Sequence, residues 1–132
     1  MSVSSRKVLN SPDVAAAVGP YSHAARVSGE LLFISGQIPL DPVTAQIVGA
    51  TPGEQARRCL ESLEIIARAG GASLSQAVKV TIYLIDMAAF AQVNEVYAEF
   101  FPSDPPARVT IAVVGLPKGA LVEIDAVLAV DA

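Results

Sequence analysis

Hydrophobic positions along the chain recur with two different spacings, and each spacing is typical of one kind of element. Between residues 56 and 67 apolar side chains follow the i, i+3, i+4, i+7 rule, which predicts a helix with one packed face. Thr51, Pro52 and Glu54 have the spacing of a capped helix start, and Gly70 with the glycine after it suits a helix end. We therefore expect a helix that runs from Pro52 to the residue before Gly70.

A stretch of strict alternation follows this helix. Between Ala77 and Ile85 apolar side chains occupy every second position, which predicts a strand with one buried face. Asp86 comes directly afterwards and can cap a second helix, which runs to about Phe101 and is ended by Pro102. The apolar stripe of this second helix is Phe90, Val93, Tyr97, Phe100 and Phe101.

Five further segments are short, apolar and bounded by turn residues, which predicts strands. They are Arg6–Asn10, Ala24–Val27, Leu31–Ser35, Arg108–Val114 and Leu121–Val130. The second and third flank Ser28-Gly29-Glu30, and the last two flank residues 115–119, so we expect each pair to form an antiparallel hairpin. The order of elements predicts an α+β sandwich, in which two helices cover one face of a mixed sheet.

The hairpin expected around Pro117 would bring charged residues together. It would place Glu123 beside Thr110 and Asp125 beside Arg108, to within one residue of register. A cross-strand ion pair between Arg108 and Asp125 is then the plain structural interpretation, and a ligand site at Arg108 is the alternative.

The composition indicates one domain, residues 1–132, that associates with copies of itself. Hydrophobic residues make up 52% of the chain and charged residues 17%, and the mean hydropathy is +0.50. So few charges cover the surface of a monomer of this size poorly, and several strands are apolar on both faces. We therefore expect a homo-oligomer in which the side of the sheet away from the helices meets other subunits.

Charge and ligand counts exclude several classes of function. The net charge is −4 and the nine Lys and Arg residues are scattered, which argues against nucleic acid as a partner. One cysteine, Cys59, and one histidine, His23, are too few for a disulfide or a Cys/His zinc site, so no metal is expected. The polar residues 1–7 lack a secretory signal, and no apolar run approaches the roughly 18 residues of a membrane span. We expect no membrane association and a cytoplasmic location.

Arg108 is the leading candidate for chemistry. A guanidinium on a strand has a fixed direction, and it can match a carboxylate with two parallel hydrogen bonds. Glu123, on the last predicted strand, adds a placed acid to a chain with few charges. Together the two residues predict a site for small molecules that carry a carboxylate.

Other positions could shape such a site, and each has a structural alternative. Asn94 lies within the apolar stripe of the second helix, where an amide needs a partner, either a structural one or a ligand. Tyr21 follows Gly19-Pro20 in a rigid loop that can hold a phenol over a pocket or against the core edge. Ser35-Gly36 ends a strand, where a glycine admits a ligand to the backbone or simply forms a turn.

Two remaining reactive side chains are interpreted as structural. His23 has no acid or nucleophile at a recognisable spacing and is assigned a surface or packing role. Cys59 lies on the packed helix stripe, which favours an inert core thiol over a reactive one. Phosphate loops, nucleophile elbows and metal-binding helix motifs are missing from the sequence.

Six short motifs follow one another along almost the whole chain. They are Gly19-Pro20-Tyr21-Ser22, Ser35-Gly36-Gln37-Ile38-Pro39, Val93-Asn94 with Tyr97 and Phe100-Phe101, Pro106-Ala107-Arg108, Leu116-Pro117-Lys118 and Val122-Glu123-Ile124. In this order they resemble the RidA (YjgF-type) reactive-intermediate deaminase family. The resemblance implies a chorismate-mutase-like α+β sandwich with a mixed six-stranded sheet and two helices on one face. It also implies a homotrimer whose sheets line an inner barrel, with substrate clefts between adjacent subunits.

The resemblance further implies an activity without a cofactor. Members hydrolyse 2-enamino and 2-imino acids, such as 2-aminoacrylate and 2-aminocrotonate, to 2-keto acids and ammonia, as 2-iminobutanoate/2-iminopropanoate deaminases. By position Arg108 would bind the substrate carboxylate and Glu123 would hold the attacking water. The remaining pocket residues would be Tyr21, Ser35, Gly36, Asn94 and the backbone at Thr110. Many deaminase members carry a cysteine where this chain has Thr110, which puts the substrate preference in question.

Three other functions stay open at this point. A specialised pathway deaminase for a different enamine, such as an aminomuconate-like acid, would use the same residues. A trimer that binds small carboxylates without catalysis, or that acts as a chaperone through its apolar sheet, belongs to another class. The ribonuclease activity attached to some relatives is disfavoured by the acidic charge and by the lack of a paired general base.

Overall fold

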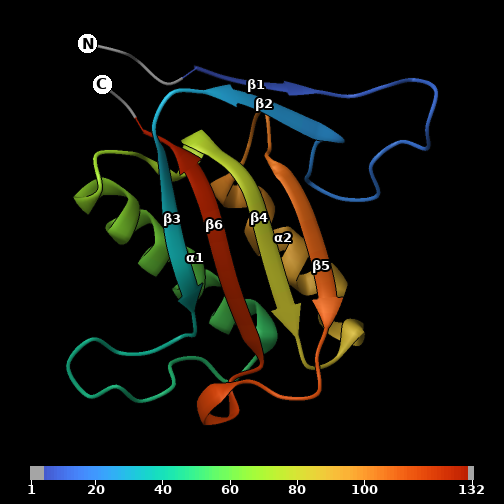
Figure 1. Cartoon of the computed structure of the whole chain (residues 1–132). Coiled ribbons are helices and arrows are strands. Elements are labelled where there is room, and N and C mark those ends of the chain that lie inside the picture. Colours follow the sequence, from blue (N-terminus) through green and yellow to red (C-terminus); the bar gives the residue numbers. More distant parts are fainter. Residues whose placement is uncertain (1–4, 131–132) are drawn as a thin grey trace.

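The structure is a computed structural model that describes residues 5–130 (Figure 1). Its main elements are β1 (Ser5–Leu9), β2 (Ala24–Ser28), β3 (Leu31–Gln37), α1 (Pro52–Ala69), β4 (Ala77–Leu84), α2 (Phe90–Phe100), β5 (Ala107–Ala112) and β6 (Val122–Ala129). Short 3-10 turns occur at Leu74–Gln76, Met87–Ala89 and Pro117–Gly119. α1 and β4 lie within one residue of the segments expected from the sequence, whereas Asp86 caps the 3-10 turn Met87–Ala89 and the α-helix begins only at Phe90.

Four strands form the main sheet, in the order β3-β6-β4-β5. β6 runs antiparallel to both β3 and β4, whereas β4 and β5 are parallel, with Val80 opposite Arg108 and Ile82 opposite Thr110. A parallel pair needs a crossover connection, and α2 supplies it between β4 and β5. This crossover makes β5 an edge strand, with α2 next to it on the helix side of the sheet.

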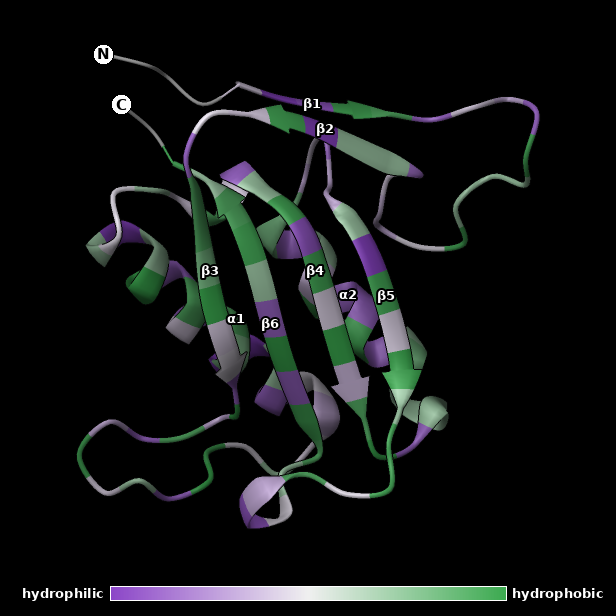
Figure 2. Ribbon diagram, viewed as in Figure 1, coloured by the Kyte–Doolittle hydropathy of each residue, from purple (hydrophilic) through white to green (hydrophobic). Residues whose placement is uncertain are grey.

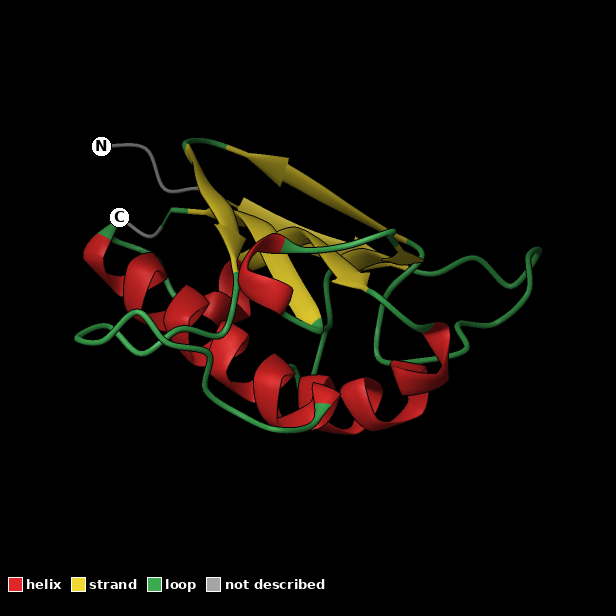
Figure 3. Ribbon diagram, turned by 90° about the horizontal axis from the view of Figure 1, so that it is seen from below, coloured by secondary structure: helices red, strands yellow, loops and turns green. Residues whose placement is uncertain are grey.

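Both helices cover one face of this sheet (Figure 3). α1 packs against β3, β6 and α2, and the core lies between the helices and the sheet. Every second residue is buried from Val80 to Leu84 in β4 and from Val122 to Leu128 in β6, as the alternating colours along the strands of Figure 2 also indicate. The largest fully buried side chains include Leu60, Leu63, Val80, Ile82, Leu84, Val93, Tyr97, Val122, Ile124 and Leu128. The α+β sandwich with helices on one side is therefore confirmed.

The start of α1 agrees with the sequence motif. The Thr51 hydroxyl accepts a hydrogen bond from the Glu54 backbone N–H at 3.2 Å, and Pro52 occupies the first helical position. The Glu54 carboxylate in turn accepts from the Ala50 backbone N–H at 2.9 Å. Gly70 follows the last turn and donates to carbonyls of that turn. These contacts satisfy backbone groups that a helix end leaves without partners.

The expected hairpin between Ala24–Val27 and Leu31–Ser35 is wrong. The turn at Ser28-Gly29-Glu30 exists, and Gly29 has φ +100°, but it separates strands of different sheets. β2 pairs with β1 in a separate two-stranded sheet, and β3 pairs with β6. The mixed six-stranded sheet is therefore wrong for the described residues: a four-stranded sheet and a two-stranded one take its place, and the two-stranded sheet crosses one end of the larger one (Figure 1).

The expected hairpin between the last two strands is also wrong. β4 lies between β5 and β6, so neither Glu123 nor Asp125 is a neighbour of β5. Glu123 is opposite Tyr83 and Asp125 is opposite Thr81. Residues 113–121 thus connect β5 to β6 across one intervening strand, with Lys118 in the left-handed region at φ +58°.

The sheet face away from the helices carries exposed apolar side chains. Phe33 is 73% exposed, and Leu31, Val109 and Ile111 are each exposed by about 40% (37%, 41% and 41%). Figure 1 views the molecule from this side, with the helices behind the sheet. An exposed apolar area of this kind is typical of a contact surface between proteins.

Two variants on α1 test where the core lies. Leu63 is fully buried and Ile65, on the same helix, is 71% exposed. We expect Leu63→Ala to lower the free energy of unfolding by about 2–5 kcal/mol, because it leaves a cavity under the helix. Ile65→Ala is the matched control and should change it by less than about 0.5 kcal/mol. Urea unfolding at equal protein concentration measures both, and equal losses would contradict this packing.

Candidate functional site

The Arg108 side chain points from β5 toward α2. Its Nη1 donates a hydrogen bond to the Asn94 Oδ1 at 2.8 Å. Asn94 thereby has the partner that an amide within an apolar helix stripe requires. The bond uses only one of the five N–H donors of the guanidinium, which leaves donors for a ligand.

Three aromatic rings surround the same guanidinium. Its central carbon lies 4.9 Å from the ring centre of Tyr97, 5.3 Å from that of Tyr21 and 5.7 Å from that of Phe90. Tyr97 and Phe90 belong to α2, and Tyr21 to the loop before β2. Aromatic faces attract a cation at these distances, and they do so without neutralising its charge.

No carboxylate within residues 5–130 forms an ion pair with Arg108. The alternative of an ion pair with Asp125 is therefore wrong, because Asp125 accepts a hydrogen bond from the Tyr83 hydroxyl at 2.8 Å instead. Burial lowers the pKa of Arg108, while Tyr97 and Tyr21 act to raise it, and an arginine keeps its charge throughout the physiological range. Arg108 is thus a half-buried cation without an acidic partner among the described residues.

The loop before β2 closes over this cation. Gly19 lies so near that a Cβ atom there would be 3.2 Å from the Arg108 Nη2 and 3.1 Å from the Asn94 Nδ2. Ser22, which is buried, anchors the loop by donating from its backbone N–H to Pro106 O at 3.1 Å and from its hydroxyl to Pro105 O at 2.5 Å. A larger residue at position 19 would therefore press on the Arg108 and Asn94 side chains and shift them by a few tenths of an ångström.

Two buried hydroxyl groups on the helix side of the sheet have no hydrogen-bond partner. They are the Tyr97 Oη, on the ring beneath Arg108, and the Thr110 Oγ1, two residues along β5 on the same face as Arg108. Burial raises the pKa of Tyr97, and the nearby Arg108 and Arg6 act to lower it. Unpaired buried hydroxyl groups are costly, so they mark a part of the structure where polar groups await partners.

Glu123 has a different setting. Between Ile34 and Gln37 the pairing of β3 with β6 contains a bulge, in which Ser35 and Gly36 lie opposite a single residue. A Cβ atom on Gly36 would be 2.1 Å from the Glu123 Oε2, closer than any real contact. The bulge and its glycine therefore provide the room for the Glu123 carboxylate.

The predicted site residues thus fall into two groups. Arg108 is level with the buried Val80, so it shares the helix face of the sheet and meets Asn94 and Tyr21 there. Glu123 is level with Tyr83, on the face away from the helices, and lies beside Ser35 and Gly36. One chain does not bring Arg108 and Glu123 together.

A shallow pocket of about 520 Å³ opens beside Arg108. It lies between the start of β2 and the beginnings of β4 and β5, and its lining includes Tyr21, Ser22, Lys79, Arg108 and Val109. The lining combines Arg108 with a second cation, Lys79, which belongs to the opposite face of the sheet by its register.

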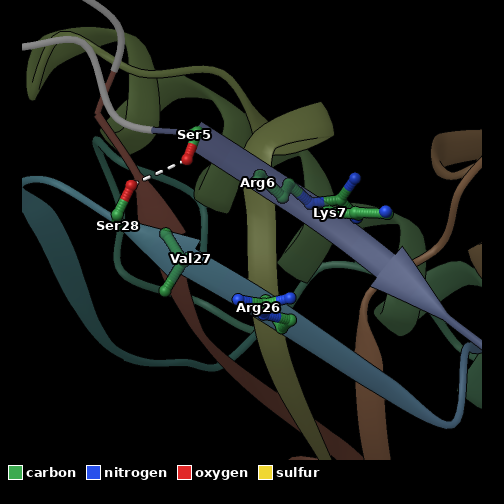
Figure 4. Close-up of a pocket in the computed structure, with 6 residues that line it drawn as sticks. All are labelled: Ser5, Arg6, Lys7, Arg26, Val27 and Ser28. Carbon is green, nitrogen blue, oxygen red and sulfur yellow. Dashed lines mark hydrogen bonds between the residues drawn. The ribbon is translucent and has the colours of Figure 1, made fainter.

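A separate pocket of about 370 Å³ lies on the hairpin of β1 and β2 (Figure 4). Lys7 and Arg26 are directly opposite each other there, next to the Ser5 and Ser28 hydroxyl groups, which are 2.7 Å apart. Like charges in this position destabilise a strand pair, but both side chains are exposed to water, which screens them. None of the site residues expected from the sequence lines this pocket.

Comparisons with known proteins agree with the arrangement of these motifs. A family model described as Endoribonuclease L-PSP matches residues 11–130. A RutC family protein from Sinorhizobium fredii is 50% identical over 120 residues, covering 91% of this chain and 94% of that protein. The chain belongs to the RidA/YjgF family.

Two further members connect this Rid chain to a named activity and to a solved structure. The 2-iminobutanoate/2-iminopropanoate deaminase of Mus musculus is 41% identical over 122 residues, covering 92% of this chain and 90% of that protein. The crystal structure of RidA from an Antarctic Psychrobacter has a TM-score of 0.74 at 35% identity, covering 94% of this chain and 99% of that one. The Rid fold is thus shared along nearly the whole length of the chain.

Sequence reasoning missed three residues that hold the Rid arginine in place. From the sequence, Phe90 is assigned to the apolar stripe of α2, Tyr97 to that stripe and a family motif, and Gly19 to a loop motif, but none of them to the site. The signal was present in the spacing, because Phe90, Asn94 and Tyr97 are separated by four and three residues and so share one helix face. What the sequence did not reveal is that β5 is the strand next to α2.

The described part of this Rid protein offers no cluster of metal-binding side chains. Within residues 5–130 no group of three or more His, Cys, Asp or Glu side chains is close enough to hold a metal ion. The helices of the same segment are too short or too polar to cross a lipid bilayer.

The single cysteine of the chain is structural. Cys59 is fully buried in α1, and its thiol lies 3.7 Å from the Val122 carbonyl oxygen. Burial, with a smaller contribution from Glu123, raises the pKa of Cys59 to about 12. The expected place of Cys59 in the core is confirmed, and the inertness of its thiol stays a prediction.

The raised pKa predicts slow labelling of Cys59. The thiol stays neutral as the pH rises from 7 toward 10, since its pKa is about 12, and roughly one thiol in ten thousand is ionised at pH 8. An aromatic disulfide reagent should therefore label the native protein at least about a hundredfold more slowly than the urea-unfolded protein. Rapid labelling of the folded protein at pH 8 would contradict the burial of this thiol.

Proposed function

We propose that this protein hydrolyses 2-imino acids, and the 2-enamino acids that tautomerise to them, to 2-keto acids and ammonia. In this reaction water adds to the C2 carbon of the imine, the C–N bond breaks, and the nitrogen leaves as ammonia. The substrates are of the 2-iminopropanoate and 2-iminobutanoate type, formed from 2-aminoacrylate and 2-aminocrotonate. The relationship to the Mus musculus deaminase supports this reaction class.

The unpaired charge of Arg108 carries the proposal. An amide and three rings hold this half-buried guanidinium in place. Its removal from water is unfavourable, and no acidic side chain among the described residues compensates for it. A substrate carboxylate supplies this compensation and can accept two parallel hydrogen bonds. Because α2 and β5 fix the guanidinium, a bound carboxylate would hold the adjacent C=N carbon at a constant position.

Glu123 is assigned the role of holding the attacking water, and this glutamate must then belong to a different subunit from Arg108. Arg108 and Glu123 lie on opposite faces of the sheet in one chain, so a site that uses both needs two copies. The exposed Phe33, Val109 and Ile111 on the open face support contact between copies. We therefore propose a homotrimer with its substrate sites between subunits, each taking Arg108 from one subunit and Glu123 from the next.

The remaining residues have supporting roles in this proposal. Asn94 and Tyr21 hold the guanidinium, Ser35 and Gly36 give access to the Glu123 carboxylate, and the Thr110 backbone borders the substrate. An imine carbon is already electrophilic, so placing a water against it is sufficient for a modest acceleration over the spontaneous reaction. This mechanism assigns no step to a metal or a cofactor.

Binding without catalysis is the second candidate function. An apolar sheet face and an available arginine would also suit a trimer that only binds small carboxylates. Calorimetry with 2-oxobutyrate separates the two functions, because binding without accelerated imine hydrolysis would favour the second.

Arg108 variants test the role of the guanidinium. Iminopropanoate and iminobutanoate are generated in situ by an amino-acid oxidase, and keto-acid formation is compared with the rate in buffer. We expect Arg108→Ala to lower kcat/KM about 10- to 100-fold, the loss that follows from removing hydrogen bonds to a charged group. Arg108→Lys keeps the charge but lacks the planar fork, and it should recover only part of the activity. Equal rates for the wild type and buffer would overturn the enzymatic proposal.

Mixed trimers test whether the site lies between subunits. Arg108→Ala and Glu123→Gln should each keep at most about a tenth of the wild-type activity, but unfolding and refolding them together at equal amounts should raise the activity to about a quarter of the wild-type value. The fraction follows because each site takes one residue at random from each of two neighbours in a closed ring. If both residues acted within one chain, the mixture would be no more active than the single variants.

Gly36→Ala tests the room beside Glu123. The new methyl group would meet the Glu123 Oε2, and the flexible carboxylate end can move away, so the free energy of unfolding should change little. Keto-acid formation should fall about tenfold or more, because the water is no longer held against the substrate. Wild-type activity in this variant would argue against any role for the Glu123 carboxylate.

A further inference from the structure

His23 occupies a position that the proposed reaction does not use. The end of the loop before β2 returns to its beginning at this residue, and three hydrogen bonds fasten the two parts. The His23 backbone N–H donates to the Asn10 Oδ1 at 2.9 Å, the ring Nδ1 accepts from the Ser11 backbone N–H at 3.0 Å, and the ring Nε2 lies 2.8 Å from the Ala15 carbonyl oxygen. The imidazole is therefore the central connection of a loop of about a dozen residues.

These contacts indicate which nitrogen of the His23 ring carries the proton. Since the Nδ1 accepts a backbone N–H, it carries no proton, and the proton of the neutral ring is on the Nε2, which donates it to Ala15. A protonated imidazole is a donor at both nitrogens, so the Nδ1–H would face the Ser11 N–H. Only the neutral ring satisfies both neighbours.

The fastened loop is the one that covers the proposed carboxylate site. Gly19 of this loop lies against Arg108 and Asn94, and the Tyr21 ring lies 5.3 Å from the guanidinium. Within the loop the Tyr21 hydroxyl accepts from the Val18 backbone N–H at 3.2 Å. Release of the loop at Ser11 would therefore change the surroundings of the Arg108 guanidinium, because Gly19 and Tyr21 move with the loop.

We propose that neutral His23 is a positioning residue, which holds the loop of residues 10–22 over Arg108 and releases it when the ring is protonated. The proposal rests on the proposed function only where substrate binding is the readout. Histidine is the side chain whose charge ordinarily changes between pH 5 and 8, and the chain has a single one.

Charged and titratable groups of three elements lie near the ring. Tyr21 from its own loop lines a pocket with His23, as do Lys79 from β4 and Arg108 from β5, and Asp13 lies in the loop itself. Protonation of the ring costs the hydrogen bond that the Ser11 N–H donates to the Nδ1.

Hydrogen exchange of the full-length protein tests the inference without any ligand. In the wild type, peptides that cover residues 10–22 should lose protection between pH 7.5 and 5.5, after correction for the intrinsic exchange rate, while peptides of α1 stay unchanged. The midpoint should coincide with the ring titration followed by ¹⁵N NMR of the imidazole. A loop whose protection does not change over this range, or changes at a different midpoint, would overturn the proposal.

Two variants separate titration from packing. In His23→Asn the side-chain oxygen can still accept from Ser11, and in His23→Gln the side-chain amide can still donate to Ala15, but neither titrates. Both should show loop protection that is independent of pH, even if it is lower than in the wild type. A loss between pH 7.5 and 5.5 as large as that of the wild type would contradict a role for ring protonation.

Binding of 2-oxobutyrate gives the functional readout. Its carboxylate stays ionised over this range, so a pH effect reports on the protein. We expect the wild-type Kd to rise about three- to tenfold from pH 7.5 to 5.5, the factor that corresponds to one lost hydrogen bond, and the Kd of His23→Asn to stay constant. Absence of binding at both pH values would count against the proposed function, whereas the exchange result alone decides the role of His23.

Discussion

The candidate site depends on one constraint: the charge of Arg108 is partly buried and has no acidic partner among the described residues. Placing the Arg108 guanidinium partly out of water is unfavourable, and within residues 5–130 no carboxylate offsets it. The compensation comes from groups that leave the charge intact: the Asn94 carbonyl oxygen and the faces of Tyr21, Phe90 and Tyr97. A neutral cage of this kind keeps the cation in place and still able to bind an anion.

The crossover topology builds that cage. α2 must pass over the sheet to join β4 to the parallel β5, and its inner face therefore faces the side chains that β5 directs toward the helices. Phe90, Asn94 and Tyr97 occupy this inner face, and Arg108 is the residue of β5 that meets them. The same packing that buries the core thus fixes the direction of the guanidinium. Glu123 belongs to the other face of the sheet, so assembly, rather than folding of one chain, must unite the two.

Local signals in the sequence were sufficient to predict the helices and the alternation of β4, and to select Arg108 as a candidate. Helix ends depend on residues within one turn, as Thr51 and Gly70 illustrate, and strand alternation depends only on which face is wet. Partner strands are different, because pairing is decided by segments far apart in the chain. Neighbouring strands often pair, which made two hairpins the natural expectation, yet the strand-helix-strand order of residues 77–112 already favoured a parallel β4–β5 pair.

That mistake about pairing also affected the site. A hairpin of the last two strands put Glu123 and Asp125 beside Arg108, whereas the true order inserts β4 between them. The residues chosen from the sequence motifs were nonetheless neighbours in two clusters, one around Arg108 and one around Gly36 and Glu123. Short motifs were enough to select these residues. Which of them share a face of the sheet depends on strand pairing between distant segments, and no short motif shows it.

The bulge gives β3 one residue more than β6 over the same stretch of the sheet. Ile34 pairs with Ala126 and Gln37 with Ile124, so β3 uses two residues where β6 uses one. A chain one residue shorter at this point could keep both pairings, and the ladder would become regular. The surplus residue is therefore dispensable for holding the sheet together. Its effect is to leave a notch at the edge strand into which an acidic side chain fits, and shortening the strand to the regular length would erase that notch while preserving the fold.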